Sequence, residues 1–512
     1  MKYIRFSLAV FLAALVFSCT KLEENFTGEL ESVDNSSITA SGLLVSAYNS
    51  LYGPFLGNGP IWSATTITSD EAIAPTRGAD WFDNGVWQAL HAHTWGNDQD
   101  QIVGYFTSML STQFAASSVL EYNPTPQQAA EAKFIRALSM YWVLDGFDQV
   151  PFRENLTDYK LAPVTLKGTE AADFIISELT SIIPDLPDGG SPTRATKNAA
   201  RALLAKVYLN YGVYMDRANP TFPKLTEVLN ETNAIIGSGA YDINDNFFDA
   251  FAPDNNVKSK ESIFTFNADG ANGTGGDVSG FVFMVSHYNM SPSGWNGFAT
   301  LSDFYDKFQA TDERRGVYYN YPGSLPNPGH RVNVGFLAGQ QYNLTTDAPL
   351  QDRNGTPLTF LPGVKLVEDN ANTLEFTGIR VIKYPFDYKY GTGNGVKDND
   401  YVLFRYPDIL LMKAEALLRN NNAGDALTIV NDLRAKRGAT PLASLDLNSM
   451  LDERGREMYW ESWRRNDLIR FGKFLQPWQN KGASDPRSLL FPIPSNQLAV
   501  NPNLVQNPGY EN

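Results

Sequence analysis

Two amphipathic helices joined by a short turn are predicted between Tyr406 and Gly438, and this unit limits the possible folds more than any other feature of the sequence. Apolar residues recur at three- and four-residue intervals on both sides of a turn at Asn420 to Gly424, which is the spacing of a buried helical face. The unit is close to the ~34-residue period of tetratricopeptide helix pairs. Several such pairs stacked together would form a helical scaffold.

The first half of the chain repeats this pattern. Amphipathic helices are predicted over residues 128–147, 170–183 and 196–215, and Thr196 is a plausible N-cap for the last of them. The small residues Ala199, Ala202 and Ala205 would allow a neighbouring helix to approach closely. The scaffold is therefore predicted to consist of helix pairs on both sides of a long insertion.

That insertion, at about residues 241–400, is dense in Gly, Pro, Asn and Asp. Short runs such as residues 262–266 and 380–386 are strands at most, and binding sites often lie on loops of this kind. The predicted fold is mainly α: a tetratricopeptide-like helix-pair scaffold, mainly 39–240 and 400–512, with a loop-rich second lobe that contains little β structure. We expect residues 39–512 to form a single body.

The N-terminus has the features of an export signal. Lys2 and Arg5 precede an apolar run from Phe6 to Phe17, which is too short for a membrane span. The following Cys19 is the only cysteine, so disulfides, thiol catalysis and cysteine–metal sites are excluded. The pattern resembles a bacterial lipobox, which predicts a signal peptide at 1–18, lipidation of Cys19 and a tether at 19–38. Ordinary secretion, with Cys19 removed or unmodified, is the alternative.

The charge of the chain excludes one class of partner. The formal net charge is -15 and the sequence pI is about 4.8. Nucleic-acid binding requires a clustered excess of Lys and Arg that neutralises phosphates. We therefore expect no nucleic-acid partner.

Four stretches together resemble the SusD/RagB family of surface nutrient-binding lipoproteins. They are residues 130–152, 404–439, 451–474 and 491–510, and they occur in the order seen in that family. The resemblance implies about four tetratricopeptide-like helix pairs and a second lobe that carries the ligand site. It also implies a lipid-anchored protein of the outer membrane, facing the exterior, and a SusC-like TonB-dependent β-barrel transporter as partner. Members bind glycans or peptides without a cofactor and without catalysis.

The segment from Ser69 to Trp95 contains three of the nine tryptophans. Trp81 lies in a loop beside Arg77 and Asp80, where a flat aromatic face could stack on a sugar ring while the charged groups bind its hydroxyls. The resemblance places a ligand-contacting loop here. Asp70 is a further ligand candidate, although loop-ordering hydrogen bonds are the stronger expectation for Asp70 and Glu71.

Other aromatic residues of this segment are predicted to pack. Trp87, His91 and Trp95 are spaced by four residues on a short predicted helix, so they would share one buried face. A zinc site at His91 and His93 is not expected, because no third ligand follows at a suitable spacing. No metal site or cofactor is predicted.

A second candidate cluster lies between residues 286 and 308. Trp295 is flanked by Gly294 and by Asn296-Gly297, a setting that would hold an indole on an exposed turn. Tyr288 and Asn296 are predicted to contribute to the same ligand site. The charged run at 452–470 is instead interpreted as a salt-bridged helix pair of the scaffold, with Glu461 three residues before Arg464.

Three functions remain open at this point. The favoured one is non-catalytic surface binding of oligosaccharides or polysaccharides and their delivery to the transporter, with peptides or other nutrients as alternative ligands of the same fold. A glycoside hydrolase would need two carboxyl groups about 5–9.5 Å apart across a cleft. A tetratricopeptide adaptor that binds only protein would not need so large a second lobe.

Overall fold

A computed structural model describes residues 38–154, 156 and 161–511. The predicted signal peptide, Cys19 and the tether as far as residue 37 lie outside these residues. From Ala40 onward the chain forms one compact unit. Among the described helices, none combines the length and the apolar character needed to cross a lipid bilayer.

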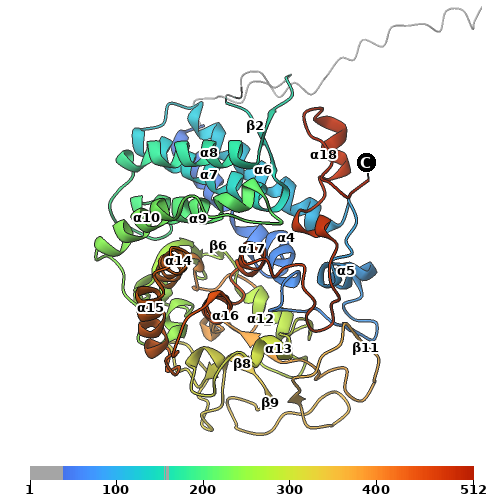
Figure 1. Cartoon of the computed structure of the whole chain (residues 1–512). Coiled ribbons are helices and arrows are strands. Elements are labelled where there is room, and N and C mark those ends of the chain that lie inside the picture. The colour runs from blue at the N-terminus through green and yellow to red at the C-terminus, as the bar shows by residue number, and fades with distance from the viewer. Residues whose placement is uncertain (1–37, 155, 157–160, 512) are drawn as a thin grey trace, which may run out of the picture. The chain divides into compact units, whose positions relative to one another are not determined.

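The scaffold is an array in which successive helices from α2 to α15 pack on one another, and α16 packs on α14 (Figure 1). Helix α10 packs directly on α14 although some 170 residues separate them, so the array continues across the inserted segment, as predicted. The helices are α2 (Ala40–Ser50), α6 (Asp100–Leu120), α7 (Pro126–Phe147), α8 (Gly168–Ile182), α9 (Lys197–Met215), α10 (Leu225–Gly237), α14 (Tyr406–Arg419), α15 (Ala423–Lys436), α16 (Leu447–Met458) and α17 (Arg464–Arg470).

Local sequence signals fix the ends of these helices. Thr125 and Gln128 form a reciprocal capping box at the start of α7, with Pro126 at the first helical position. The Thr196 side chain accepts a hydrogen bond from the Ala199 amide at the start of α9, which confirms the predicted N-cap. The predicted pair from Tyr406 to Gly438 is confirmed as α14 and α15.

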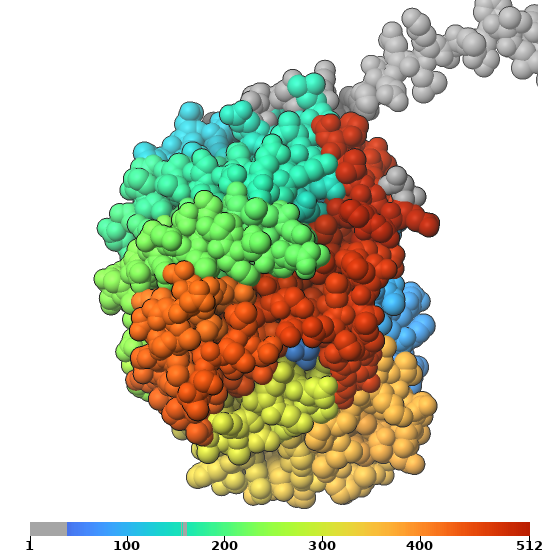
Figure 2. Space-filling view, viewed as in Figure 1, coloured from blue at the N-terminus to red at the C-terminus, as the bar shows by residue number. Residues whose placement is uncertain are grey.

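The inserted lobe contains only small sheets, which confirms the expected low β content. Strand β4 (Ser262–Phe266) near its start pairs with β13 (Tyr401–Arg405) at its end, so the lobe leaves and rejoins the scaffold at one place. Figure 2 shows the surface of the lobe, in yellow and light orange, next to the orange surface of α14 and α15. Within the lobe, three further groups of strands pair: β5 (Ala268–Asp269) with β6 (Thr274–Gly275), β8 (Val334–Leu337) with both β7 (Gly316–Val317) and β12 (Arg380–Ile382), and β9 (Gly339–Gln340) with β10 (Thr359–Phe360). Strand β11 (Val367–Glu368) of the lobe pairs with β1 (Thr76–Arg77). Outside the lobe, β2 (Gln149–Phe152) pairs with β3 (Val164–Lys167).

Short helices link these elements and shape the loops between them. The segment after α12 carries one of the candidate clusters, and α5 follows the other. The short helices are α3 (Tyr52–Phe55), α4 (Pro60–Trp62), α5 (Val86–Ala92), α11 (Asn255–Lys258), α12 (Ser279–Val285), α13 (Ser302–Tyr305) and α18 (Ser495–Val500).

A fully buried ion cluster joins the lobe to the scaffold. Glu457 on α16 lies 2.6 Å from Arg405, 3.0 Å from Arg437 and 2.9 Å from Arg314, measured between side-chain nitrogen and oxygen atoms. Arg314 comes from the lobe, whereas the other residues come from the scaffold. Removing one member of such a cluster leaves its partners as uncompensated buried charges.

The predicted pairing of Glu461 with Arg464 is wrong. Helix α16 ends at Met458 and α17 begins at Arg464, so the two residues do not lie one turn apart on a continuous helix. Glu461 pairs instead with Arg405 at 2.8 Å and with Lys383 at 2.5 Å. The charged run does form two helices of the scaffold, but all its charges except that of Asp452 are buried and not solvated.

Neutralising Glu457 tests the ion cluster. Glu457→Gln is expected to lower the free energy of unfolding by about 3–5 kcal/mol, because the buried arginines lose a partner charge. Chemical denaturation measures this. The matched control is Glu227→Gln, which removes a half-exposed pair with Lys224 and should cost less than about 1 kcal/mol. Equal effects of the two substitutions would contradict the assigned role of the cluster.

The same cluster predicts acid sensitivity. Burial alone would raise the pKa of Glu453, but the neighbouring Arg314 and Arg456 guanidinium groups outweigh it and lower the pKa to about 2. The unfolded-state pKa of glutamate is about 4.3, so this contribution to stability is complete above that pH and is lost as the pH falls towards 2. Denaturation curves from pH 6 to pH 2.5 should therefore show a decline that is shallower in Glu453→Gln. A decline of the same size in both proteins would count against this assignment.

Candidate functional site

Two loops that are far apart in sequence meet beside α12. The Trp81 indole nitrogen donates a hydrogen bond to the carbonyl of Trp295 at 2.8 Å. The Tyr288 hydroxyl donates to the Asp80 carboxylate at 2.7 Å. The structure thus brings four of the predicted site residues together, and we call the group formed by Trp81, Trp295, Tyr288 and Asp80 the tryptophan platform.

The two indoles of the platform differ in exposure. Trp295 is 45% exposed, and its backbone is held by a 2.7 Å hydrogen bond from its amide to the Phe283 carbonyl. Trp81 is half-buried and packs its ring 5.0 Å from Phe298, between centroids. Trp295 therefore offers the larger free aromatic face.

Glycine is required where the two loops touch. A Cβ atom at Gly297 would lie 2.3 Å from the Trp81 indole, which is closer than any real contact. The residue before it, Asn296, has a left-handed backbone with φ of 51°, a conformation that Asn tolerates better than most residues. The sequence Asn296-Gly297 is thus what permits Trp81 to pack against the second loop.

The polar edge of the platform includes a residue that the sequence did not indicate. The Arg353 guanidinium lies over the Tyr288 ring at 4.2 Å from its centroid and is paired with Glu375 at 2.5 Å. Its side chain is about half exposed. Burial, followed by the hydrogen bond to Asp80, raises the pKa of Tyr288 to about 12, so its hydroxyl stays protonated and donates a hydrogen bond to Asp80.

Arg77 and Asn296 lie beneath the platform. The Arg77 guanidinium is buried and donates to the Leu374 carbonyl at 2.6 Å and to the Thr377 hydroxyl at 2.8 Å. The Asn296 amide, also buried, donates to the Glu375 carbonyl at 2.8 Å. The sequence predicts ligand contact for both residues; their burial makes them supports that hold the platform in place.

Asp70 belongs to the scaffold and not to the platform. Its carboxylate accepts two hydrogen bonds from Arg464, at 2.6 and 2.7 Å. Burial would raise the pKa of Asp70, but the Arg464 charge lowers it below its usual range. Glu71 accepts a hydrogen bond from the Trp460 amide, and burial raises the pKa of Glu71 to about 8. Both residues make the loop-ordering contacts expected of them.

Trp87 and Trp95 are buried, which confirms their predicted packing role. The predicted shared helical face is wrong for Trp95: α5 ends at Ala92, and His93 has a left-handed backbone with φ of 59°. Trp95 is held instead by a 2.7 Å hydrogen bond to the Tyr510 hydroxyl. In the described part of the chain, no three His, Cys, Asp or Glu side chains gather in a way that could hold a metal ion.

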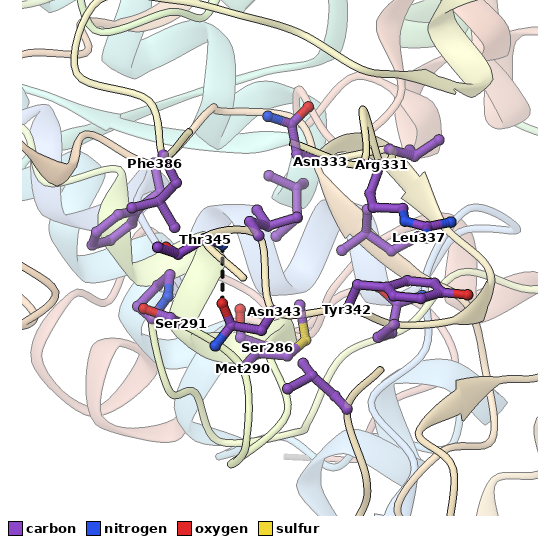
Figure 3. Close-up of a pocket in the computed structure, with 18 of the residues that line it drawn as sticks. Ser286, Met290, Ser291, Arg331, Asn333, Leu337, Tyr342, Asn343, Thr345 and Phe386 are labelled. Atoms are coloured by element: carbon purple, nitrogen blue, oxygen red, sulfur yellow. Dashed lines mark hydrogen bonds between the residues drawn. The ribbon is translucent and has the colours of Figure 1, made fainter. Parts of the chain in front are cut away.

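A cavity of about 630 Å³ lies in the same lobe (Figure 3). The loop that carries Tyr288 and Trp295 supplies one wall through residues 286 to 292, and the other walls come from residues 321 to 350 and 382 to 388. None of its lining residues is Asp or Glu. Its walls come from loops, short strands and the end of α12, none of which carries a motif, so no sequence signal indicated it.

Comparisons with known proteins agree with this architecture. The starch-binding protein SusD of Bacteroides thetaiotaomicron is 28% identical over 420 residues, which cover 76% of this chain and 73% of that protein. A SusD-like protein of Formosa agariphila, P2, is 24% identical over the whole of both chains. The model of the SusD family matches residues 260–485. The chain is thus similar to SusD and SusD-like proteins over most of its length.

Solved structures of SusD-like proteins share its fold. A laminarin-binding SusD-like protein superimposes with a TM-score of 0.70 at 20% identity, covering 92% of this chain and 99% of the other. A SusD superfamily protein from Parabacteroides distasonis gives the same TM-score at 21% identity, covering 92% and 98%. The fold of this protein is therefore shared with these SusD-like proteins.

Substituting two arginines, one buried beneath the platform and one at its exposed edge, tests these assignments. Arg77→Ala is expected to lower the free energy of unfolding by roughly 1–3 kcal/mol, because buried carbonyl and hydroxyl groups lose their donor. Arg353→Ala should cost less, up to about 1 kcal/mol, because its guanidinium is half exposed and the buried Glu375 keeps its hydrogen bond from His287. Parallel denaturation curves measure both, and the reverse order of effects would contradict the assignment.

Proposed function

We propose that this protein is a non-catalytic cell-surface protein that binds oligosaccharides or polysaccharides on the tryptophan platform. The observation that carries the proposal is the exposed Trp295 indole beside the polar groups of Asp80 and Arg353. An exposed indole face can stack on the C–H face of a sugar ring. A relative named for starch binding, a structural neighbour named for laminarin binding and another solved in complex with laminarihexaose support a glycan as the ligand.

The polar groups of the platform suit sugar hydroxyls. One Asp80 carboxylate oxygen accepts from Tyr288, and the other accepts from no described residue. Arg353 adds a half-exposed guanidinium on the other side of the Tyr288 ring. Such a site binds a single ring weakly, and affinity rises when several rings of one chain are contacted together.

The distribution of carboxylates favours binding over hydrolysis. A glycosidase places two carboxyl groups on either side of the scissile bond. On the platform Asp80 is exposed, whereas Glu375 is buried and accepts hydrogen bonds from both Arg353 and His287. The cavity lining contributes no carboxylate at all. We therefore assign no catalytic role.

The proposal extends to the place of the protein in the cell. Lipidation at Cys19 would anchor it in the outer membrane, facing the exterior. A SusC-like TonB-dependent transporter would receive the bound glycan from it. Both statements rest on the sequence resemblance described above, and the helical array supplies a broad surface on which a protein partner could dock.

The platform predicts a selective binding defect. Trp295→Ala is expected to weaken binding of the cognate oligosaccharide at least about tenfold, because loss of one stacking contact removes roughly 1.4 kcal/mol. The melting temperature should change little because Trp295 is exposed. Calorimetry with a glycan panel that includes maltoheptaose and laminarihexaose measures the affinity, and thermal denaturation measures the melting temperature.

The matched control is Phe114→Ala, which removes an exposed aromatic ring on α6, 60% exposed, outside the platform. It should leave glycan affinity unchanged. Equal affinity of Trp295→Ala and the parent protein would overturn the assigned site. Shorter products, detected by chromatography after long incubation of the protein with its bound glycan, would favour a hydrolase.

A further inference from the structure

The cavity beside the platform is lined by polar side chains with groups that have no hydrogen-bond partner among the described residues. Ser286 is 1% exposed, and its hydroxyl forms no hydrogen bond with any described residue. Gln341 is 8% exposed; its amide nitrogen donates to the Gly339 carbonyl, while its amide oxygen accepts no hydrogen bond within the described chain. Both residues line the cavity, so these two groups are available to water or to a polar ligand.

Further hydrogen-bonding groups lie around the same space. The side-chain oxygen of Asn343 accepts a hydrogen bond from the Thr345 amide at 2.9 Å (Figure 3). The side-chain nitrogen of Asn343 donates to no described residue, so it can donate to a ligand. The Asn289 amide donates to the Gln351 carbonyl, and its oxygen has no described partner. These four side chains offer the cavity both donors and acceptors, and all four are uncharged.

The charge of the lining argues for a neutral ligand. No Asp or Glu lines the cavity, so nothing there would compensate a cationic group. The one guanidinium in the lining belongs to Arg331, which is already paired with Asp347 at 2.7 and 3.2 Å and stacked over Tyr342 at 3.6 Å. An anionic ligand would have to compete with Asp347 for it.

Aromatic side chains complete the walls and connect the cavity to the platform. Tyr342, Phe386 and Tyr388 line it. The Phe283 ring lies 6.0 Å from Trp295 and 6.0 Å from Phe386, between centroids, so it contacts both regions. The same loop carries Tyr288, which hydrogen-bonds within the platform, and Asn289, which lines the cavity.

We propose that the cavity is a second carbohydrate subsite, which takes one uncharged sugar unit at the end or at a branch of the chain held by the platform. Aromatic walls with a few buried donors and acceptors are the composition of a small-molecule site, and the volume lies within the usual range of such sites. The inference rests on the proposed function, since the platform supplies the rest of the glycan. It adds the class of sugar unit and the way it is held.

Blocking the cavity tests the proposal directly. Ala338 is exposed and lines the cavity, so Ala338→Trp should fill the space without breaking a buried contact. Ala348→Trp is the matched control, because Ala348 is exposed on the neighbouring loop and does not line the cavity. Ser286→Ala removes the unpartnered hydroxyl without adding volume. Thermal denaturation of each variant checks that it is folded.

Saturation-transfer NMR titrations with glucose, galactose, mannose and xylose measure binding of single neutral sugars, and glucosamine and glucuronate serve as charged probes. At least one neutral sugar should bind the parent protein, more tightly than either charged probe. Its affinity should fall about tenfold or more in Ala338→Trp and Ser286→Ala and stay unchanged in Ala348→Trp. Absence of binding by every neutral sugar, or binding that survives Ala338→Trp, would overturn the proposal.

These experiments distinguish a wrong assignment of the platform from a wrong assignment of the cavity. If Trp295→Ala abolishes oligosaccharide binding while Ala338→Trp leaves both oligosaccharide and monosaccharide binding intact, the platform function stands and the cavity subsite is wrong. If Ala338→Trp abolishes monosaccharide binding while Trp295→Ala keeps full oligosaccharide affinity, the cavity subsite stands and the platform is wrong.

Discussion

The contact of Glu457 with three buried arginines is the interaction on which the rest of the structure depends. Arg314 comes from the loop-rich lobe, whereas Arg405 and Arg437 come from the scaffold on either side of α14 and α15. Loops without regular hydrogen bonding have no rigid geometry of their own, and a site built on loops needs a rigid base. The buried charges provide that base because any movement that separates them exposes an uncompensated ion to a nonpolar interior.

A series of buried contacts connects the scaffold to the platform. Arg464 on α17 holds Asp70 at the start of the first loop. Further along that loop, Arg77 holds the turn at Leu374 and Thr377, and Gly297 leaves room for the Trp81 ring. The exposed Trp295 face is therefore positioned by groups that do not themselves reach solvent. Charges are concentrated in these supports, while the cavity lining has hardly any, a division that suits an uncharged, hydroxyl-rich ligand.

Periodic features of the sequence predicted the fold well. The helix pair α14 and α15, the cap at Thr196 and the low β content follow from spacing and local capping chemistry, which act within one or two helical turns. The exposed position of Trp295 also followed from local signals, because the adjacent Gly294 and Asn296-Gly297 favour a turn.

Contacts between distant segments could not be predicted in the same way. Residue type indicates that Arg77 or Asp70 can bind a hydroxyl, but only the fold shows that each is already satisfied by partners some 300 to 400 residues away. The Glu461–Arg464 pairing failed because a helix break lies between the two residues. Arg353 and the cavity arise from loops and short strands of the lobe whose sequences carry no periodic signal.

The most direct measurement of the central claim is a crystal structure of the protein with an oligosaccharide that it binds in solution. The account predicts a sugar ring lying against the Trp295 indole, with hydroxyl groups within hydrogen-bonding distance of Asp80 or Arg353. An oligosaccharide bound elsewhere on the protein, with the Trp295 face left open to solvent, would contradict it.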